Sequence, residues 1–152
     1  MKTEIITTNP SINLYKSHKE NIDASRKLLF SRLNRINPQI KNQIEKLYKD
    51  RKATNKLPYL GELYPWVIAD LFGFKDSDTI QEVSQDWLAL YYYTIFTDDV
   101  IDSNEKNFAG NEIISLTALM KEGLFKLYKA VIGTPYEQEF ETAINSVLDS
   151  GK

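Results

Sequence analysis

The chain has 152 residues, of which 42% are apolar and 26% are charged, and its formal net charge is −2. This length suits one domain with a substantial hydrophobic core. The absence of cysteine excludes disulfides, thiolate metal sites and cysteine nucleophiles, and a single histidine excludes histidine-rich metal sites. No apolar run approaches the roughly 20 residues of a membrane span. The N-terminus lacks the apolar core of a signal peptide, so we expect a cytoplasmic protein without a membrane span.

Charge is divided unevenly along the chain. Residues 1–56 contain 13 Lys/Arg and 5 Asp/Glu, whereas residues 57–152 contain 6 and 16. A basic half is one sign of a nucleic-acid-binding protein. Its charges are spread over helical faces with few aromatic residues between them, so we expect no nucleic-acid partner. His18 lies on a polar helix face beside Lys19 and Glu20 and is expected to be solvated.

The first half of the chain predicts a flexible N-terminus over residues 1–13 and a single helical domain over residues 14–152. Apolar residues recur at helical spacing from Leu14 to Ile36. Asn37-Pro38 is typical of a helix start, with a capping side chain and a first-turn proline, and this helix should run to about residue 52. A linker is expected over residues 51–56.

The second half predicts three or more further helices. In residues 57–74, Pro65 should limit or kink a helix. A long helix ending near residue 103 should start at one of four clustered N-cap candidates, Asp76, Ser77, Asp78 and Thr79, of which Thr79 fits a capping box with Glu82. A break is expected at Gly110, followed by a helix over residues 112–131 and a last one from Thr134 to about residue 150. Because no segment alternates with a two-residue period, the predicted class is an all-α bundle of five to seven helices.

The stretch WLALYYYTIFTDDVID, residues 87–102, is the most informative part of the sequence. At helical spacing, one side of it carries both aromatic rings and carboxylates: Trp87, Tyr91, Thr94, Asp98 and Asp102. The other sides are apolar, which predicts a buried helix. Carboxylates at a helix C-terminus oppose its dipole and repel one another unless a cation is present. Mg²⁺ prefers such oxygen ligands together with substrate phosphates, whereas the alternative is a solvated acidic helix end.

DDVID, with Asp98, Asp99 and Asp102, resembles the aspartate-rich motif of the class I isoprenoid synthases. The wider pattern of Tyr64-Pro65, Trp87 and the FTDD sequence resembles the microbial class I terpene synthases. The resemblance covers residues 63–102. It implies part of the class I isoprenoid synthase fold and a Mg²⁺-dependent terpene synthase-like lyase that ionises a prenyl diphosphate. All three aspartates would be catalytic, with Asp98 and Asp102 as metal ligands and Asp99 beside them.

The same resemblance implies that Trp87, Tyr91, Thr94 and Phe96 contact the substrate. Aromatic faces stabilise a carbocation and shield it from water. The alternative for the aromatic side chains is ordinary core packing. That alternative applies most to Phe96, because a helical projection points it away from the carboxylates.

The sequence departs from the terpene synthases in its second metal motif, which places Asn/Asp, Ser/Thr and Glu at four-residue intervals. Asn111 and Ser115 have the first spacing, but Leu119 stands where the glutamate should be. The chain therefore resembles an N-terminal half, and we expect self-association or a missing C-terminal half, since half a bundle would expose the apolar helix at residues 87–102. The alternatives are a truncated or inactive relative, a non-catalytic helical interaction protein, and a relative of the chain-elongating prenyl diphosphate synthases.

Overall fold

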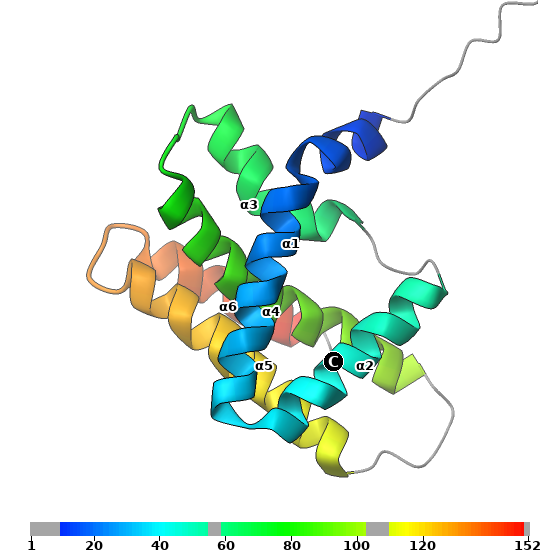
Figure 1. Cartoon of the computed structure of the whole chain (residues 1–152). Coiled ribbons are helices and arrows are strands. Elements are labelled where there is room, and N and C mark those ends of the chain that lie inside the picture. Colours follow the sequence, from blue (N-terminus) through cyan, green and yellow to red (C-terminus); the bar gives the residue numbers. More distant parts are fainter. Residues whose placement is uncertain (1–9, 55–58, 103–109, 151–152) are drawn as a thin grey trace, which may run out of the picture.

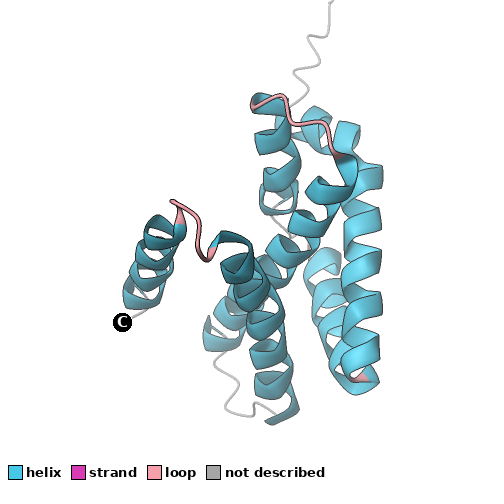
Figure 2. Cartoon of the chain, turned by 90° about the vertical axis from the view of Figure 1, so that its left-hand side faces the viewer, coloured by secondary structure: helices cyan, strands magenta, loops and turns pink. Residues whose placement is uncertain are grey.

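The structure is a computed structural model that describes residues 10–54, 59–102 and 110–150, and its regular structure in these ranges is entirely helical (Figures 1 and 2). This confirms the predicted all-α class. The helices are α1 (Pro10–Ile36), α2 (Pro38–Ala53), α3 (Tyr59–Leu71), α4 (Ser77–Asp102), α5 (Gly110–Val131) and α6 (Glu137–Ser150).

Local capping explains most of the helix boundaries. The Asn37 side chain accepts a hydrogen bond from the Gln39 N–H at 2.8 Å, and Pro38 opens α2, as predicted. Helix α1 begins at Pro10, four residues before its expected start. Gly110 was expected to break the chain, but it is the first residue of α5. Pro65 lies inside α3 without ending it.

The start of α4 differs from the predicted capping box. Asp76 Oδ1 accepts from the backbone N–H groups of Asp78 and Thr79 at 3.2 and 3.4 Å, and its Oδ2 accepts from the Thr79 hydroxyl at 2.7 Å. Asp76 is therefore the residue that caps α4. The predicted box of Thr79 and Glu82 is wrong because Thr79 already lies in the first turn.

We expect Asn37→Ala to lower the free energy of unfolding by about 1 kcal/mol, because the substitution removes the side chain that caps α2. Urea titration followed by circular dichroism measures this change. Asn34→Ala is the matched control, since Asn34 is an exposed residue within α1. Equal effects of the two substitutions would contradict the capping role of Asn37.

Helix α4 runs through the middle of the fold and packs against α1, α3 and α5 (Figure 1). The main core combines its apolar faces with side chains from α1, α2 and α5: Leu29, Leu33, Ile44, Tyr48, Leu88, Ala89, Tyr92, Ile95, Phe96, Leu116 and Leu119. The expectation that this helix would expose its apolar wall is therefore wrong. The exposed apolar side chains include Leu71, Phe72 and Phe74 around the tip between α3 and α4, and Phe125 on α5.

Two glycines allow neighbouring helices to approach α4 closely. A Cβ atom on Gly123 of α5 would lie 2.4 Å from the backbone nitrogen of Leu90. A Cβ atom on Gly61 of α3 would lie 2.2 Å from the ring of Tyr91. Both distances are far below van der Waals contact. A larger residue at position 123 would push α5 away from the backbone of α4, and one at position 61 would displace the Tyr91 ring.

Candidate functional site at the end of helix α4

One side of α4 carries the predicted row of aromatic and acidic residues, which we call the stripe: Trp87, Tyr91, Thr94, Asp98 and Asp102. The stripe is covered at its aromatic end and open at its acidic end. The Trp87 indole N–H donates to the Gly61 carbonyl oxygen at 2.6 Å, and its ring lies edge-on to Tyr64 with centroids 5.9 Å apart. Tyr91 is half-buried against Gly61. Thr94 and Asp98 are exposed. Helix α3 therefore covers the aromatic part of the stripe and leaves its acidic part accessible to solvent.

Asp99 is held by an arginine from another helix. Arg51 of α2 forms an ion pair with the Asp99 carboxylate, and its Nη1 also donates to the Ile95 carbonyl oxygen at 3.0 Å. A cation at this position stabilises the C-terminal end of α4, where carbonyl groups and carboxylates gather negative charge. The ion pair engages the Asp99 carboxylate, which the sequence predicted to lie beside the metal ligands.

Asp98 forms no ion pair with any residue that the structure describes. Asp102 follows four residues later as the last residue of α4, but its side chain lies outside the described part of the chain. Among the described side chains, no group of three or more His, Cys, Asp and Glu residues is placed to hold a metal ion. Asp98 and Asp102, four residues apart on one helix, would provide the hard oxygen ligands that Mg²⁺ prefers. Mg²⁺ binding at this end of α4 stays a prediction.

Phe96 lies apart from the stripe. Its side chain is completely buried in the main core and stacks on Tyr92, with centroids 5.5 Å apart and an interplanar angle of 20°. The structure therefore does not bring Phe96 together with Asp98. Its position favours the core-packing alternative for this residue.

The side chains of two positions in the incomplete second metal motif, 115 and 119, also lie in the interior. The side chain of Asn111 lies outside the described part of the chain. Ser115 and Leu119 of α5 are both buried, and Leu119 belongs to the main core. A glutamate at position 119 would place an unpaired carboxylate among apolar side chains. The leucine at this position is explained by the packing of α5 on α4.

A buried ionic cluster at the junction of α1, α3 and α4 was not predicted from the sequence. Arg26 Nη2 donates to both carboxylate oxygens of Glu62 at 2.9 and 3.0 Å, and its Nε donates to the Tyr92 hydroxyl at 3.0 Å. The Tyr92 hydroxyl donates in turn to Glu62 Oε1 at 2.5 Å. The lone acidic residue in the apolar segment LPYLGELYPW was the available signal, because a carboxylate in such a segment needs a buried partner.

Asp23 and Tyr48 also contact Arg26. Arg26 Nη1 donates to Asp23 Oδ1 at 2.7 Å, and the guanidinium lies 4.7 Å from the ring centroid of Tyr48. Burial, followed by the negative charge of Glu62, raises the pKa of Tyr92 well above its usual value. Tyr92 is therefore neutral at physiological pH and keeps the proton that it donates to Glu62.

His18 is not the solvated residue that the sequence predicted. Its Nε2 lies 3.0 Å from Asp70 Oδ2, and its ring stacks on Trp66 at 6.2 Å between centroids. Only 13% of its side chain is exposed. The charged neighbours of His18 in the sequence do not reveal this packing, because Trp66 and Asp70 come from α3.

No protein-family model matches this chain, and neither a curated protein nor a solved structure matches it significantly. The all-helical fold is what the structure establishes, and the resemblance to the isoprenoid synthases depends on residues 63–102 alone. Within the described ranges, no helix is both long and apolar enough to cross a membrane.

Proposed function

We propose that the acidic end of α4 binds Mg²⁺ together with a prenyl diphosphate, as part of a terpene synthase-like lyase site. The observation that supports this most directly is the different placement of two neighbouring carboxylates. Asp99 is paired with Arg51, whereas Asp98 is exposed, is unpaired among the described residues and lies four residues before Asp102. Asp98 and Asp102 would be the two metal ligands.

The side chains on the stripe suit a substrate with a diphosphate and an apolar tail. Bound Mg²⁺ would supply Lewis-acid assistance to the departure of the diphosphate. Trp87 and Tyr91 place half-buried aromatic rings further along the same side of α4. The prenyl tail would extend from the acidic end toward these rings, and Thr94 lies between the two regions.

We propose that the residues of this sequence bind Mg²⁺ and the prenyl diphosphate but do not complete the lyase reaction by themselves. The second metal motif of the terpene synthases is interrupted at Leu119, which is buried in the core. Ionisation of the substrate would need a second set of metal ligands on the open side of the stripe, supplied by another polypeptide segment.

The first test is calorimetric titration of the chain with a non-hydrolysable farnesyl diphosphate analogue, with and without Mg²⁺. We expect binding that requires Mg²⁺ and that weakens at least about tenfold in Asp98→Asn, because one of two metal ligands loses its charge. Asp99→Asn should weaken binding less, since Arg51 already holds that carboxylate. Asp78→Asn, at the opposite end of the same helix, is the matched control and should bind like the parent chain.

Circular dichroism of each variant distinguishes loss of the site from loss of the fold. A folded parent chain that binds the analogue equally with and without Mg²⁺, or not at all, would overturn the proposal. That result would favour the non-catalytic helical protein. Additional Mg²⁺-dependent binding of isopentenyl diphosphate would instead favour a relative of the chain-elongating synthases.

A further inference from the structure

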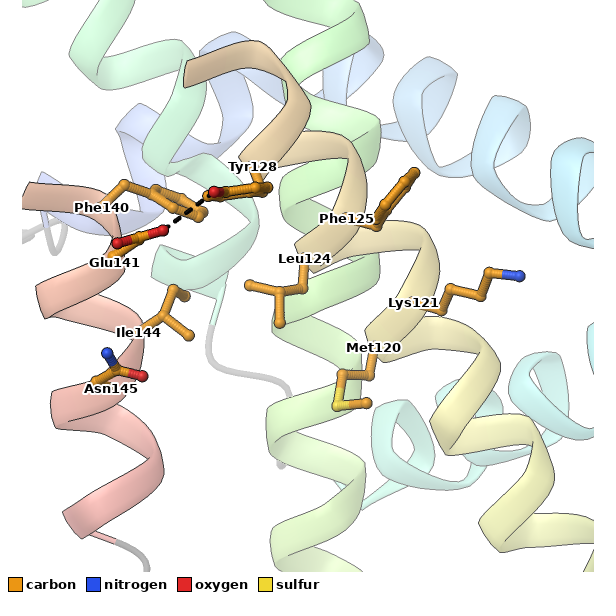
Figure 3. A pocket seen from close by; sticks show the side chains of 9 residues that line it. All are labelled: Met120, Lys121, Leu124, Phe125, Tyr128, Phe140, Glu141, Ile144 and Asn145. Carbon is orange, nitrogen blue, oxygen red and sulfur yellow. Dashed lines mark hydrogen bonds between the residues drawn. The ribbon is translucent and has the colours of Figure 1, made fainter. Parts of the chain in front are cut away.

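Helices α5 and α6 enclose an apolar groove of about 580 Å³ (Figure 3). Tyr128 and Phe140 close one end, with ring centroids 6.2 Å apart. Leu124 and Ile144 project from the two walls into the space between the helices. A groove with this volume and lining is large enough to take side chains from a partner.

Hydrogen bonds across the turn hold the two walls of the groove together. The Tyr128 hydroxyl on α5 lies 3.1 Å from Glu137 Oε1 and 3.0 Å from Glu141 Oε1 on α6. The Gly133 N–H in the turn donates to Glu137 Oε2 at 2.8 Å. Helix α6 packs on α5 at the edge of the molecule (Figures 1 and 2), so the groove belongs to one helical hairpin.

The two helices of the hairpin carry opposite charge on their exposed sides. On α5, the exposed lysines Lys121 and Lys129 flank Phe125, whose side chain is 57% exposed. Neither lysine forms an ion pair with a described residue. Helix α6 contains no Lys or Arg, and its Glu139 and Glu141 are exposed. The hairpin therefore has an apolar centre with a basic side and an acidic side.

We propose that this groove is a homodimer interface, in which the α5–α6 hairpins of two copies pack into a four-helix arrangement. A two-fold interface must be self-complementary, because each residue pair occurs twice with the roles exchanged. Lys121 and Glu141 line opposite walls of the groove. A two-fold axis through the groove brings Lys121 of each copy to Glu141 of the other, while Phe125 and Leu124 cover apolar surface of the partner. A single-signed groove would repel its own copy.

The test measures the mass of the full chain by sedimentation equilibrium over concentrations from about 1 to about 100 µM. We expect a monomer–dimer equilibrium for the parent chain. Lys121→Glu and Glu141→Lys should each raise the dimer dissociation constant at least about tenfold, because each change places like charges together twice. Lys27→Glu makes the same charge change on an exposed residue of α1 and should leave the constant unchanged.

Mixing the variants gives a sharper result. The Lys121→Glu chain and the Glu141→Lys chain should each be mainly monomeric alone, and together they should form a heterodimer. Its affinity should lie between those of the variants and the parent, because Glu141→Lys also removes an acceptor for the Tyr128 hydroxyl. The double variant should also regain a homodimer. A general loss of stability cannot produce this recovery, since unfolded partners would not complement each other.

Apolar substitutions distinguish this interface from the other exposed apolar surface. Phe125→Ser should weaken the dimer, whereas Phe72→Ser, at the tip between α3 and α4, should not. A parent chain that stays monomeric throughout the concentration range overturns the proposal. A dimer that is insensitive to both charge changes, or that Phe72→Ser alone disrupts, overturns it as well.

Discussion

Replacing Glu62 by glutamine is expected to lower the free energy of unfolding by about 3 kcal/mol, although the two side chains have nearly the same shape. Glu62 is only 1% exposed, and both of its carboxylate oxygens accept from Arg26. The substitution removes a buried negative charge and leaves the guanidinium without its main counter-ion. The loss is large because a buried, uncompensated charge cannot regain the hydration that it has in the unfolded chain.

Urea unfolding at neutral pH measures this loss. Glu45→Gln is the matched control, because Glu45 pairs with Lys41 and Lys49 at the surface of α2 and should contribute less than about 1 kcal/mol. Replacing Arg26 by methionine, Glu62 by leucine and Tyr92 by phenylalanine together should restore much of the stability, since neither an unpaired charge nor an unpaired buried hydroxyl remains. If Glu62→Gln and Glu45→Gln cost the same, the buried cluster does not stabilise the fold in the way described.

Gly123→Ala is expected to destabilise the chain by about 2 kcal/mol, through overpacking between α4 and α5. In an open helix the same substitution stabilises by about 1 kcal/mol, because alanine is the better helix former. Here the new methyl group would lie 2.4 Å from the nitrogen and 2.8 Å from the Cα atom of Leu90. Those atoms belong to the backbone of α4, so they cannot rotate away as a side chain could.

Thermal and urea unfolding of Gly123→Ala should therefore show a loss of stability. Gly110→Ala is the control, since a Cβ atom at Gly110, at the start of α5, has no non-neighbouring atom of the described residues within 4 Å. This second substitution should be neutral or stabilising. The opposite signs of the two effects are the critical result, and a stabilising Gly123→Ala would contradict the close contact of the two helices.

The sequence by itself determined the helical class, the boundaries of α2 and the extent of α4. These features depend on interactions within a few residues, such as the Asn37 cap and the apolar spacing along residues 87–102. Local rules offered both Asp76 and Thr79 as caps of α4, three positions apart, and their capping-box choice of Thr79 was wrong. The prediction of Mg²⁺ and prenyl diphosphate binding likewise comes from the sequence, through the spacing and resemblance of DDVID.

Only the tertiary structure decided which polar groups meet. Arg26 is 36 residues from Glu62 and 66 from Tyr92 in the chain, and Arg51 approaches Asp99 from a different helix. Their separate positions in the sequence are compatible with many pairings. The packing of α1, α2 and α3 around α4 sets these pairings. A buried charge is tolerated only where a partner lies within hydrogen-bond distance, and here the partner comes from another helix.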